Sequence, residues 1–319
     1  MKRRSLVLAG AATLLAAPGL RAQDYPARPI TMVVPYGPGG LDSQFRVIAQ
    51  VAGRQLGQPI VVLNRPGANG TLGPVQVTRT AQPDGYTVSG QAATLLRQPH
   101  LVKGDWNPVT DFSWIIGLGA QSCAVAVRED SPIRNLRELV ERARTRPDSL
   151  SYATPGTGGT LHLLMADLTR RAGVRCVHVP FNSGGEAVTA LLGGHVDAGV
   201  YSVGSAIPQL QARKLRLLTV FDAERLPTFA DVPTAREQGY DLAYVSRYGL
   251  VGPKGMPAPV VRQLHDAFKA GMEDASNLAL LKTLGEVPSY MSTAQYTRWA
   301  AEAYEQERGF VESAGLLAR

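Results

Sequence analysis

The sequence predicts an α/β fold with two lobes, and three patterns along the chain support this prediction. Short apolar runs with the length of buried strands alternate with stretches of helical periodicity, which is typical of mostly parallel sheets covered by helices. A glycine-rich turn between an expected strand and an expected helix occurs twice, within residues 30–53 and 150–173. The end of the chain is almost entirely helical. With 319 residues, of which 45% are hydrophobic, the chain can form two packed cores.

Ten apolar runs are the expected strands, and they divide between the lobes in chain order. They are residues 30–34, 59–63, 86–90, 114–118, 123–127, 150–153, 176–179, 197–201, 215–220 and 248–252. We expect the first four in lobe 1 and the next five in lobe 2. Three helices follow, at 257–274, 277–284 and 293–315, and helices without strands between them need a sheet to cover. We expect them to return to lobe 1. Lobe 1 then comprises residues 23–120 plus 246–319, and lobe 2 comprises residues 121–245.

The N-terminus has the pattern of a secretory signal peptide in residues 1–22. Basic residues at positions 2–4 precede an apolar segment, residues 6–20, and we expect cleavage after Ala22. Two adjacent arginines in the basic region leave twin-arginine export open beside the general route. We therefore expect an exported protein.

Charge and composition argue against a nucleic-acid partner. Removing the four basic residues of the signal from the 33 of the chain leaves 29, against 26 acidic residues, a net charge of +3. Clusters of Lys and Arg interleaved with aromatic residues, which nucleic-acid binding favours, are not found in the sequence. After the leader, no segment has the ~20 apolar residues that a membrane helix needs. We expect no cofactor and no metal.

The first glycine-rich stretch, ITMVVPYGPGGLDSQFRVIAQVAG, predicts a strand, a loop and a helix that can bind an anion. Residues 30–34 have the β-branched content of a buried strand, and Pro35 and the glycines after it cannot continue that strand. Apolar residues at helical spacing follow Asp42, the expected N-cap. Free N–H groups and the dipole at a helix N-terminus attract a carboxylate or phosphate without lysine. A simple turn is the alternative interpretation.

The second stretch, LSYATPGTGGTLHLLMADLTRRAG, repeats this pattern, and two such loops suggest two facing lobes. Its threonine hydroxyls and glycine amides precede a helix expected from Leu161. These groups belong to Thr154, Thr157 and Thr160 and to Gly156, Gly158 and Gly159. The lysine of a phosphate-binding loop and the spacing of a dinucleotide fingerprint are both missing, so nucleotide binding is disfavoured.

Nine segments in order from Tyr25 to the C-terminus carry a resemblance to one family. They include YPARPITMVVPYGPGG, GQPIVVLNRPGANG, LSYATPGTGGTLHL, DVPTAREQGYD and RYGLVGPKGMPAPVVRQL. They resemble the periplasmic substrate-binding proteins of the tripartite tricarboxylate transporter family, also called Bug receptors. The resemblance implies a type II periplasmic-binding-protein fold, in which two Rossmann-like lobes are joined by two crossing strands. It also implies a small organic carboxylate bound between the glycine-rich loops and delivered to membrane permease subunits. We expect a monomer.

Carried over onto this sequence, the resemblance gives two sets of ligand-binding residues. The first loop supplies Tyr36, Gly37, Gly39, Gly40 and Asp42, and the second supplies Thr154, Gly156, Thr157, Gly158 and Thr160. We expect Asp42 to organise its loop rather than to contact the ligand, because two carboxylates repel each other. A ligand with an ammonium group would reverse this preference. We expect His162 to be hydrogen-bonded behind the loop. The first loop is one residue shorter than the family pattern, so the resemblance specifies the bound carboxylate and not the rest of the ligand.

Five further residues are candidates for the rest of the ligand. Asn182 and Ser183 precede a helix, so capping and ligand contact are both open. Tyr201 and Ser202 stand at the carboxyl end of a strand, which favours the cleft. Arg247 lies on the second crossing strand that the resemblance implies. Its guanidinium could hold a distal carboxylate with two hydrogen bonds, or it could have a structural partner.

The cysteines and the rival functions complete the expectations. Export favours a disulfide between Cys123 and Cys176. The family topology instead places their strands about three positions apart, hence ~14 Å, beyond the ~7 Å Cα limit. We expect two buried thiols. A periplasmic hydrolase is disfavoured because GVYSVG lacks the G-x-S-x-G spacing and HExxH does not occur, so we expect no enzyme. A receptor that serves a signalling partner remains an alternative.

Overall fold

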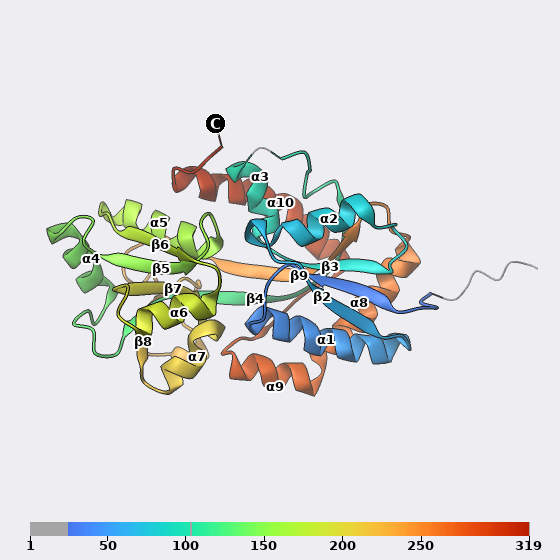
Figure 1. The fold of residues 1–319 in the computed structure, drawn as a ribbon, viewed down its shortest axis with the longest axis horizontal. Coiled ribbons are helices and arrows are strands. Elements are labelled where there is room, and N and C mark those ends of the chain that lie inside the picture. Colours follow the sequence, from blue (N-terminus) through green and yellow to red (C-terminus); the bar gives the residue numbers. More distant parts are fainter. Residues whose placement is uncertain (1–24, 103, 319) are drawn as a thin grey trace, which may run out of the picture.

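Two long strands run through the middle of the molecule and join its two lobes (Figure 1). The computed structural model describes residues 25–102 and 104–318. The crossing strands are β4 (Phe112–Arg128) and β9 (Val245–Pro253), and they pair antiparallel from Phe112↔Pro253 to Ser122↔Val245. The sequence predicted two strands, at 114–118 and 123–127, where the structure has one strand of 17 residues. The less apolar residues between these runs remain in the strand because β9 supplies their hydrogen-bond partners.

Lobe 1 has a mixed sheet covered on both faces by helices (Figure 1). Its strands β1, β2 and β3 are parallel, while β3 pairs antiparallel with β9 and a short strand, β10, pairs antiparallel with β4. The strand bounds are β1 (Ile30–Val34), β2 (Ile60–Asn64), β3 (Thr87–Ala92) and β10 (Pro288–Met291). The helices are α1 (Gly40–Leu56), α2 (Leu72–Thr80), α3 (Thr94–Leu101), α8 (Ala258–Glu273), α9 (Ala275–Thr283) and α10 (Thr293–Ser313), with a 3-10 turn, η1 (Ala68–Gly70).

Lobe 2 repeats the arrangement on the other half of β4. Strand β5 pairs parallel with β6 and β7, while β7 and β8 both pair antiparallel with β4. The strand bounds are β5 (Ser151–Pro155), β6 (Val177–Phe181), β7 (Ala198–Ser202) and β8 (Leu215–Val220). The helices are α4 (Leu136–Thr145), α5 (Thr160–Ala172), α6 (Gly184–Leu192) and α7 (Val203–Gln211), with a 3-10 turn, η2 (Pro227–Phe229). Strand pairs that do not include a crossing strand are therefore parallel, whereas every pair that includes β4 or β9 is antiparallel. The sequence predicted mostly parallel sheets, and the structure has a mixed sheet.

Each lobe has its own apolar core, built from the faces that the sequence pattern predicted. In α1 the residues Phe45, Ile48 and Ala52 recur at helical spacing and are buried against the sheet. Lobe 1 also buries Met32, Leu250, Leu264 and Phe268 in this core. The core of lobe 2 contains Val125, Leu139, Leu164, Val200 and Phe221.

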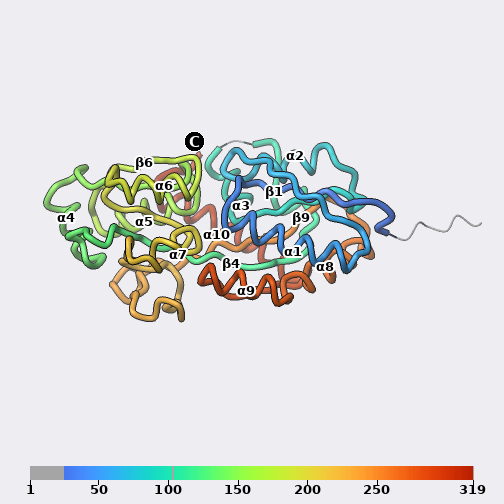
Figure 2. Tube along the Cα trace, turned by 60° about the horizontal axis from the view of Figure 1, so that its bottom comes forward, coloured from blue at the N-terminus to red at the C-terminus, as the bar shows by residue number. Residues whose placement is uncertain are grey.

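The C-terminal helices return to lobe 1, as expected. Figure 2 shows the blue N-terminal segment and the orange and red C-terminal helices together in one half, with the green and yellow middle of the chain in the other. The last turns of α10 reach lobe 2, where Phe310 packs against the core and stacks on Tyr244 with ring centroids 5.2 Å apart. Helix α10 is therefore a second connection between the lobes beside the crossing strands.

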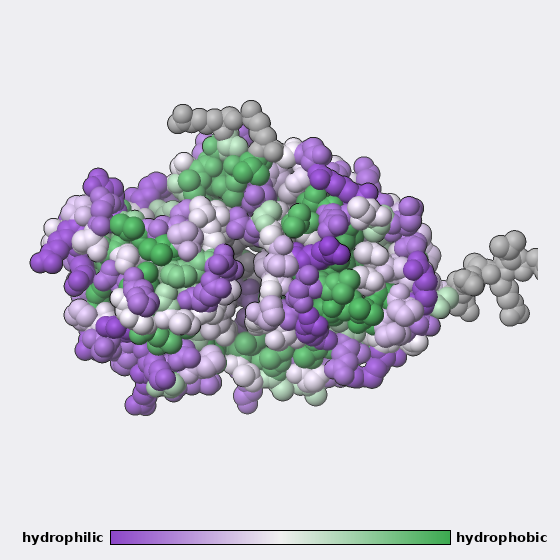
Figure 3. All heavy atoms as spheres, viewed as in Figure 1, coloured by the Kyte–Doolittle hydropathy of each residue, from purple (hydrophilic) through white to green (hydrophobic). Residues whose placement is uncertain are grey.

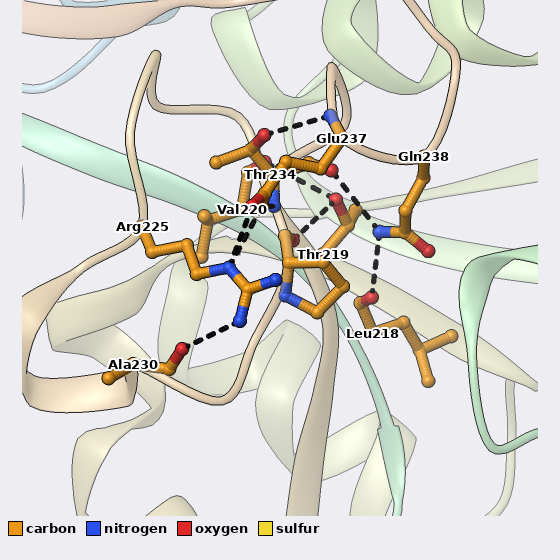
Figure 4. Close-up of polar contacts among 9 residues, drawn as sticks. Leu218, Thr219, Val220, Arg225, Ala230, Thr234, Glu237 and Gln238 are labelled. Carbon is orange, nitrogen blue, oxygen red and sulfur yellow. Dashed lines mark hydrogen bonds and ion pairs between the residues drawn. The ribbon is translucent and has the colours of Figure 1, made fainter.

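The long connection from β8 to β9 is held on lobe 2 by polar contacts (Figure 4). Arg225 Nε lies 2.9 Å from each carboxylate oxygen of Glu237, and Arg225 Nη1 donates to the carbonyl of Ala230 at 3.0 Å. Gln238 Nε2 donates to the carbonyl of Leu218 at 3.2 Å, which ties the end of this segment to β8. The guanidinium of Arg225 lowers the pKa of Glu237. These contacts hold residues 225–238 of the connection on lobe 2.

The two cysteines are both free, as expected. Cys123 is buried on β4, whereas Cys176 is only partly buried because it precedes β6, the outermost strand of lobe 2. The expectation of two buried thiols is therefore wrong for Cys176. Among the described residues, no helix combines the length and apolar character needed to cross a bilayer. The expected signal peptide, residues 1–22, lies outside the described residues.

Candidate functional site

A cavity of about 690 Å³ lies between the lobes, at the carboxyl ends of β1 and β5. The space-filling view shows a hollow in the middle of this face (Figure 3). Its wall is formed by both glycine-rich loops, which we call the first loop (residues 35–39) and the second loop (residues 156–159). Of the expected ligand-binding residues, the wall contains Tyr36, Gly37, Gly39, Gly40, Asp42, Gly156, Thr160, Asn182, Ser183, Tyr201 and Ser202. The structure places Thr154, Thr157, Gly158 and Arg247 outside this wall.

The first loop leads directly into α1, whose N-cap is Gly39. The expectation that Asp42 caps this helix is wrong, because the helix begins at Gly40 and Asp42 lies in its first turn. Glycine has no side chain with which to cap, so the N–H groups of this first turn are not satisfied by the cap residue. They lie at the cavity wall together with the positive end of the helix dipole.

Asp42 organises the first loop, as expected. Its side chain is 7% exposed and accepts hydrogen bonds from Asn64 Nδ2 at 2.7 Å and from Arg46 Nε at 2.9 Å. The same amide of Asn64 donates to the carbonyl of Tyr36 at 2.8 Å. Asp42 and Asn64 together therefore attach both ends of the first loop to the end of β2.

Tyr36 is held as a fixed part of the cavity wall. A Cβ added to Gly70 would lie 2.5 Å from the Tyr36 ring, so only glycine fits beneath the ring, and Gly70 also has a φ of +85°. The hydroxyl oxygens of Tyr36 and Thr94 lie 3.3 Å apart, within hydrogen-bonding distance. Burial raises the pKa of Tyr36 above its usual value, so the phenol stays neutral at physiological pH.

The second loop uses several of its polar groups within the protein. Gly156 N donates to the carbonyl of Phe181 at 2.8 Å, and Gly158 N donates to His162 Nδ1 at 3.0 Å. The sequence assigned both amides to an anion, but each already has a protein acceptor. Thr154 is fully buried, and its hydroxyl donates to the carbonyl of Gly156 at 3.0 Å. The first-turn amides of α5 receive no hydrogen bond from a cap side chain, since the N-cap of this helix is again a glycine, Gly159.

Two stacked histidines support the second loop from behind. The rings of His162 and His178 are 3.9 Å apart and nearly parallel, at 14°. Because Thr154 uses its proton for Gly156, His178 Nε2, 2.7 Å from the Thr154 hydroxyl, must carry a proton and donate. His162 Nδ1 accepts from the loop, so its proton is on Nε2. Burial lowers the pKa of His162, and burial together with His162 lowers the pKa of His178 to about 4.

The remaining candidates are mostly engaged in local structure. Ser183 Oγ accepts from Glu186 N at 3.2 Å and caps α6, and Asn182 N donates back to the Glu186 carboxylate at 3.2 Å. The hydroxyl of Tyr201 donates to a buried carbonyl, that of Ala187, at 2.8 Å. Of the two alternatives for Asn182 and Ser183, helix capping therefore explains the hydrogen bonds that these residues make.

The last two candidates, Ser202 and Arg247, lie on strands that both pair with β4. Ser202 Oγ lies 2.7 Å from Ser205 Oγ at the start of α7, and both serines face the cavity. Arg247 Nη1 donates to Ser289 Oγ at 2.7 Å, and burial lowers the pKa of this guanidinium. The structural partner expected as one alternative for Arg247 is therefore Ser289 on β10.

Several wall residues had no distinctive signal in the sequence. The crossing strands contribute Gln121 and Ser246, which lie outside the expected apolar runs, and Cys123, which begins one of them. The others are Asn69, Thr94 and Ser205. Asn69 is part of the motif RPGANG, and this glycine-rich turn was the available clue. Among the described residues, no group of three or more His, Cys, Asp or Glu side chains is placed to hold a metal ion.

Comparison with known proteins identifies the family to which this architecture belongs. The model of the tripartite tricarboxylate transporter family receptor matches residues 44–316, most of the chain. The chain belongs to this receptor family. Its members are receptors of periplasmic binding-protein type, which agrees with two lobes around a cavity and with the resemblance of the loop motifs.

Relatives along the whole chain support the assignment. A UPF0065 protein from the gbd 5′ region of Cupriavidus necator is 39% identical over 99% of each chain. The structure of the periplasmic binding protein BugD is similar with a TM-score of 0.85 and 31% identity, over 92% of this chain and 100% of BugD. MatC from Rhodopseudomonas palustris, solved with bound malate, is similar with a TM-score of 0.83 and 28% identity, over 90% of this chain and 100% of MatC.

Proposed function

We propose that this receptor binds a small organic carboxylate between its lobes and delivers it to membrane permease subunits of the tripartite tricarboxylate type. The observation that carries the proposal is that α1 and α5, from different lobes, both begin at one cavity with glycine as the N-cap. Each helix N-terminus presents unpaired N–H groups and roughly half a positive charge, which stabilise a carboxylate without a cationic side chain. The malate bound to MatC supports the same chemistry.

We propose that the ligand carboxylate lies between the first turns of α1 and α5. Gly37, Gly39 and Gly40 contact it from the first loop, and Thr160 contacts it from the start of α5. Tyr36 and Gly156 shape the wall. The rest of the ligand then meets the side of the cavity formed by Asn182, Ser183, Tyr201 and Ser202. Thr154, Thr157, Gly158 and Arg247 act through the residues they contact.

The proposal includes the route and the form of the protein. Residues 1–22 direct export to the periplasm and are removed near Ala22. The monomer has lobe 1 in residues 23–120 plus 246–319 and lobe 2 in residues 121–245, and it binds its ligand without catalysing a reaction or using a cofactor. Binding favours the closed arrangement of the lobes to the extent that the ligand has higher affinity for it.

Thermal unfolding of ligand-stripped, refolded protein tests the proposed ligand class. The panel contains mono-, di- and tricarboxylates including malate, aromatic acids and amino acids. A ligand at 100 times its dissociation constant adds about 2.7 kcal/mol of stability. Stabilisation by one class of acids supports the proposal, whereas a panel without any stabilising acid contradicts it.

A matched pair of variants tests the location of the carboxylate. A Cβ at Gly39 or at Gly159 finds room, with nearest atoms at 4.0 Å and 3.5 Å. Gly39→Ala and Gly159→Ala should therefore fold, yet each adds a methyl group beside the first-turn amides and should weaken binding of the stabilising acid. Gly309→Ala, on the exposed side of α10 where a Cβ also finds room and the backbone is not left-handed, is the control for a glycine change away from the cavity. Wild-type affinity in both loop variants would contradict the two-loop site.

A further inference from the structure

Lobe 1 contacts the ligand-binding side of lobe 2 directly, through two polar side chains. Asn69 Nδ2 donates to the carbonyl of Thr157 at 2.8 Å, and Arg97 Nη1 donates to Thr160 Oγ1 at 2.8 Å. The donors lie in η1 and α3 of lobe 1, and the acceptors lie in the second loop and at the start of α5 in lobe 2. Both hydrogen bonds therefore cross the cleft, and both reach the segment that forms one wall of the cavity.

Asn69 is shaped for this contact in two ways. Its backbone is left-handed, with φ 56° and ψ 33°, a conformation that asparagine adopts more readily than most residues. In the second loop, a Cβ at Gly156 would lie 3.0 Å from Asn69 Oδ1, and one at Gly158 would lie 3.6 Å from Asn69 Nδ2. Both glycines also have positive φ, +84° and +76°. The glycines of the second loop thus admit a side chain from the other lobe, which is a role separate from binding an anion.

Arg97 is the buried counterpart of Asn69. Its side chain is 1% exposed, and three different nitrogens have partners. Nε lies 2.6 Å from Glu307 Oε2, Nη2 donates to the hydroxyl of Tyr244 at 2.8 Å, and Nη1 donates to Thr160. The Tyr244 hydroxyl donates in turn to Glu307 Oε1 at 2.6 Å. Glu307 neutralises the guanidinium, so Arg97 can orient Thr160 without presenting an unpaired charge to a ligand.

Helix α3 links the two sides of the cavity. Thr94 lies one helical turn before Arg97, on the same face, and its hydroxyl is 3.3 Å from that of Tyr36 beside the first loop. One short helix, α3, therefore contacts Tyr36 through its first residue and Thr160 through Arg97, one turn later. The relative position of the two ligand loops is set through this helix as well as through the crossing strands.

We propose that Asn69 and Arg97 are positioning residues that hold lobe 1 on the second loop and favour the closed arrangement before a ligand binds. The consequence for affinity rests on the proposed function, but the effect on lobe closure does not. When the lobes separate, Asn69 loses its hydrogen bond to the carbonyl of Thr157 and donates to water instead. Arg97 has to release Thr160 in a buried setting. The two contacts together therefore bias the equilibrium on which any ligand acts.

The experiment measures the distance between the lobes without added ligand. Spin labels are placed on exposed positions of α1 and α6 by Gln50→Cys and Thr189→Cys, in a Cys176→Ala background that removes the partly exposed native thiol. Double electron–electron resonance then gives the distribution of interlobe distances in the full chain. Asn69→Gly removes the donor but retains a residue that adopts the left-handed backbone, and Thr160→Val removes the acceptor of Arg97 with little change of shape.

Each single variant should reduce the ratio of closed to open molecules about two- to tenfold, which corresponds to a net hydrogen bond of about 0.5–1.5 kcal/mol. The variant that combines Asn69→Gly with Thr160→Val should have a lower ratio of closed to open molecules than either single variant. Arg79→Ala, which removes an exposed contact with Asp105 inside lobe 1, is the control and should leave the distribution unchanged. Wild-type protein that shows only the open distance, or Asn69→Gly with an unchanged distribution, would overturn the proposal.

A second arm separates this proposal from the ligand assignment. Malate, the probe named by the MatC structure, is added to the wild type and to Asn69→Gly. If malate binds, we expect Asn69→Gly to release it two- to tenfold faster because the closed form is less populated. Equal release rates in the two proteins would contradict the link from the contact to binding. If malate binds neither protein, the ligand choice fails, while the distance distributions still decide whether Asn69 holds the lobes.

Discussion

The two glycine-rich loops have nearly the same sequence pattern, yet they meet the cavity in different ways. The first loop is largely exposed, at residues 37–39, and is anchored through Asp42 and Asn64 at its two ends. The second loop has Gly158 and Gly159 buried, uses two of its amides within the protein, and is contacted from lobe 1. The same pattern of strand, glycines and helix thus gives two different loops. The first is an open loop, exposed to solvent, whose backbone N–H groups can bind a ligand. The second is a braced loop, held by contacts within the protein, which forms a fixed part of the cavity wall.

Removing the charge partner of Arg97 should have the largest effect and tests the bracing of the second loop. Glu307→Ala leaves the buried guanidinium of Arg97 uncompensated, and breaking a buried ion pair from one side costs about 3–5 kcal/mol. Urea unfolding of this variant should show that loss. Arg28→Ala, which breaks an exposed pair with Asp84, should cost less than ~1 kcal/mol and serves as the comparison. Equal losses in the two variants would mean that the network around Arg97 does not brace the protein.

A pair of glycine substitutions should next distinguish the two loops by stability. Gly158 has φ +76°, and its Cβ would lie 3.2 Å from Leu101, so Gly158→Ala should lower the free energy of unfolding by roughly 1–3 kcal/mol. Gly39 has an extended backbone with φ 166° and open space, so Gly39→Ala should change it by less than ~0.5 kcal/mol. Denaturant titration of both variants measures the difference. If the first loop were as sensitive as the second, the contrast between an open and a braced loop would be wrong.

Acid should weaken the second loop through its histidine pair. The pKa of His178 is lowered to about 4 from about 6.5 in the unfolded chain, so between these values the unfolded state binds more protons. Stability is therefore complete above pH 6.5 and falls as the pH decreases toward 4, with a slope of at most about 1.4 kcal/mol per pH unit for one proton. Protonated His162 would also lose its bond from Gly158. Chemical unfolding at a series of pH values measures the slope.

Two acids, the buried Glu286 and the partly buried Asp222, change stability in the opposite sense, so the histidine effect needs a matched variant. Burial raises the pKa of Glu286 to about 7 and that of Asp222 to about 6, so their folded forms gain protons first and stability rises as the pH falls through these values. His178→Gln keeps a side chain that can donate to Thr154 but cannot titrate. The free energy of unfolding of the wild type should therefore fall more steeply between pH 6.5 and 4 than that of His178→Gln. If the two proteins show the same pH dependence, the histidine pair is not the source of the loss.

The sequence predicted the elements well because burial periodicity reports which face of a segment is apolar. All ten expected strand runs are strands, two of them merged into β4, and the three C-terminal helices lie where the pattern placed them. The short strand β10 was missed because its burial is partial along its length. The sequence could not give the partners of individual N–H groups, since the acceptors of Gly156 and Gly158 come from Phe181 and His162.

The same limit explains what was missed at the site. Arg97 has no signal in the sequence, since its three partners come from positions 63, 147 and 210 residues away. Arg247 was a candidate for a distal carboxylate because of its residue type, but the fold gives it Ser289 as a partner. Polar residues acquire their roles from contacts that the topology creates, so motif spacing locates the loops without assigning every group in them.

The smallest effect concerns the charge in the first loop. Asp42→Asn removes the ion pair with Arg46, which is largely exposed on the arginine side, but an asparagine carbonyl can still accept from Asn64. Stability measured by denaturant unfolding should therefore fall by less than ~1 kcal/mol.

If Asp42 only organises the loop, the affinity for a simple carboxylate should be unchanged or slightly higher, because a negative charge near the bound anion is removed. A selective loss of amino-acid binding in Asp42→Asn would instead show that Asp42 contacts an ammonium group. In that case the first loop would recognise both charges of the ligand, and the division between an open donor loop and a braced wall would need a second charged contact on the open side.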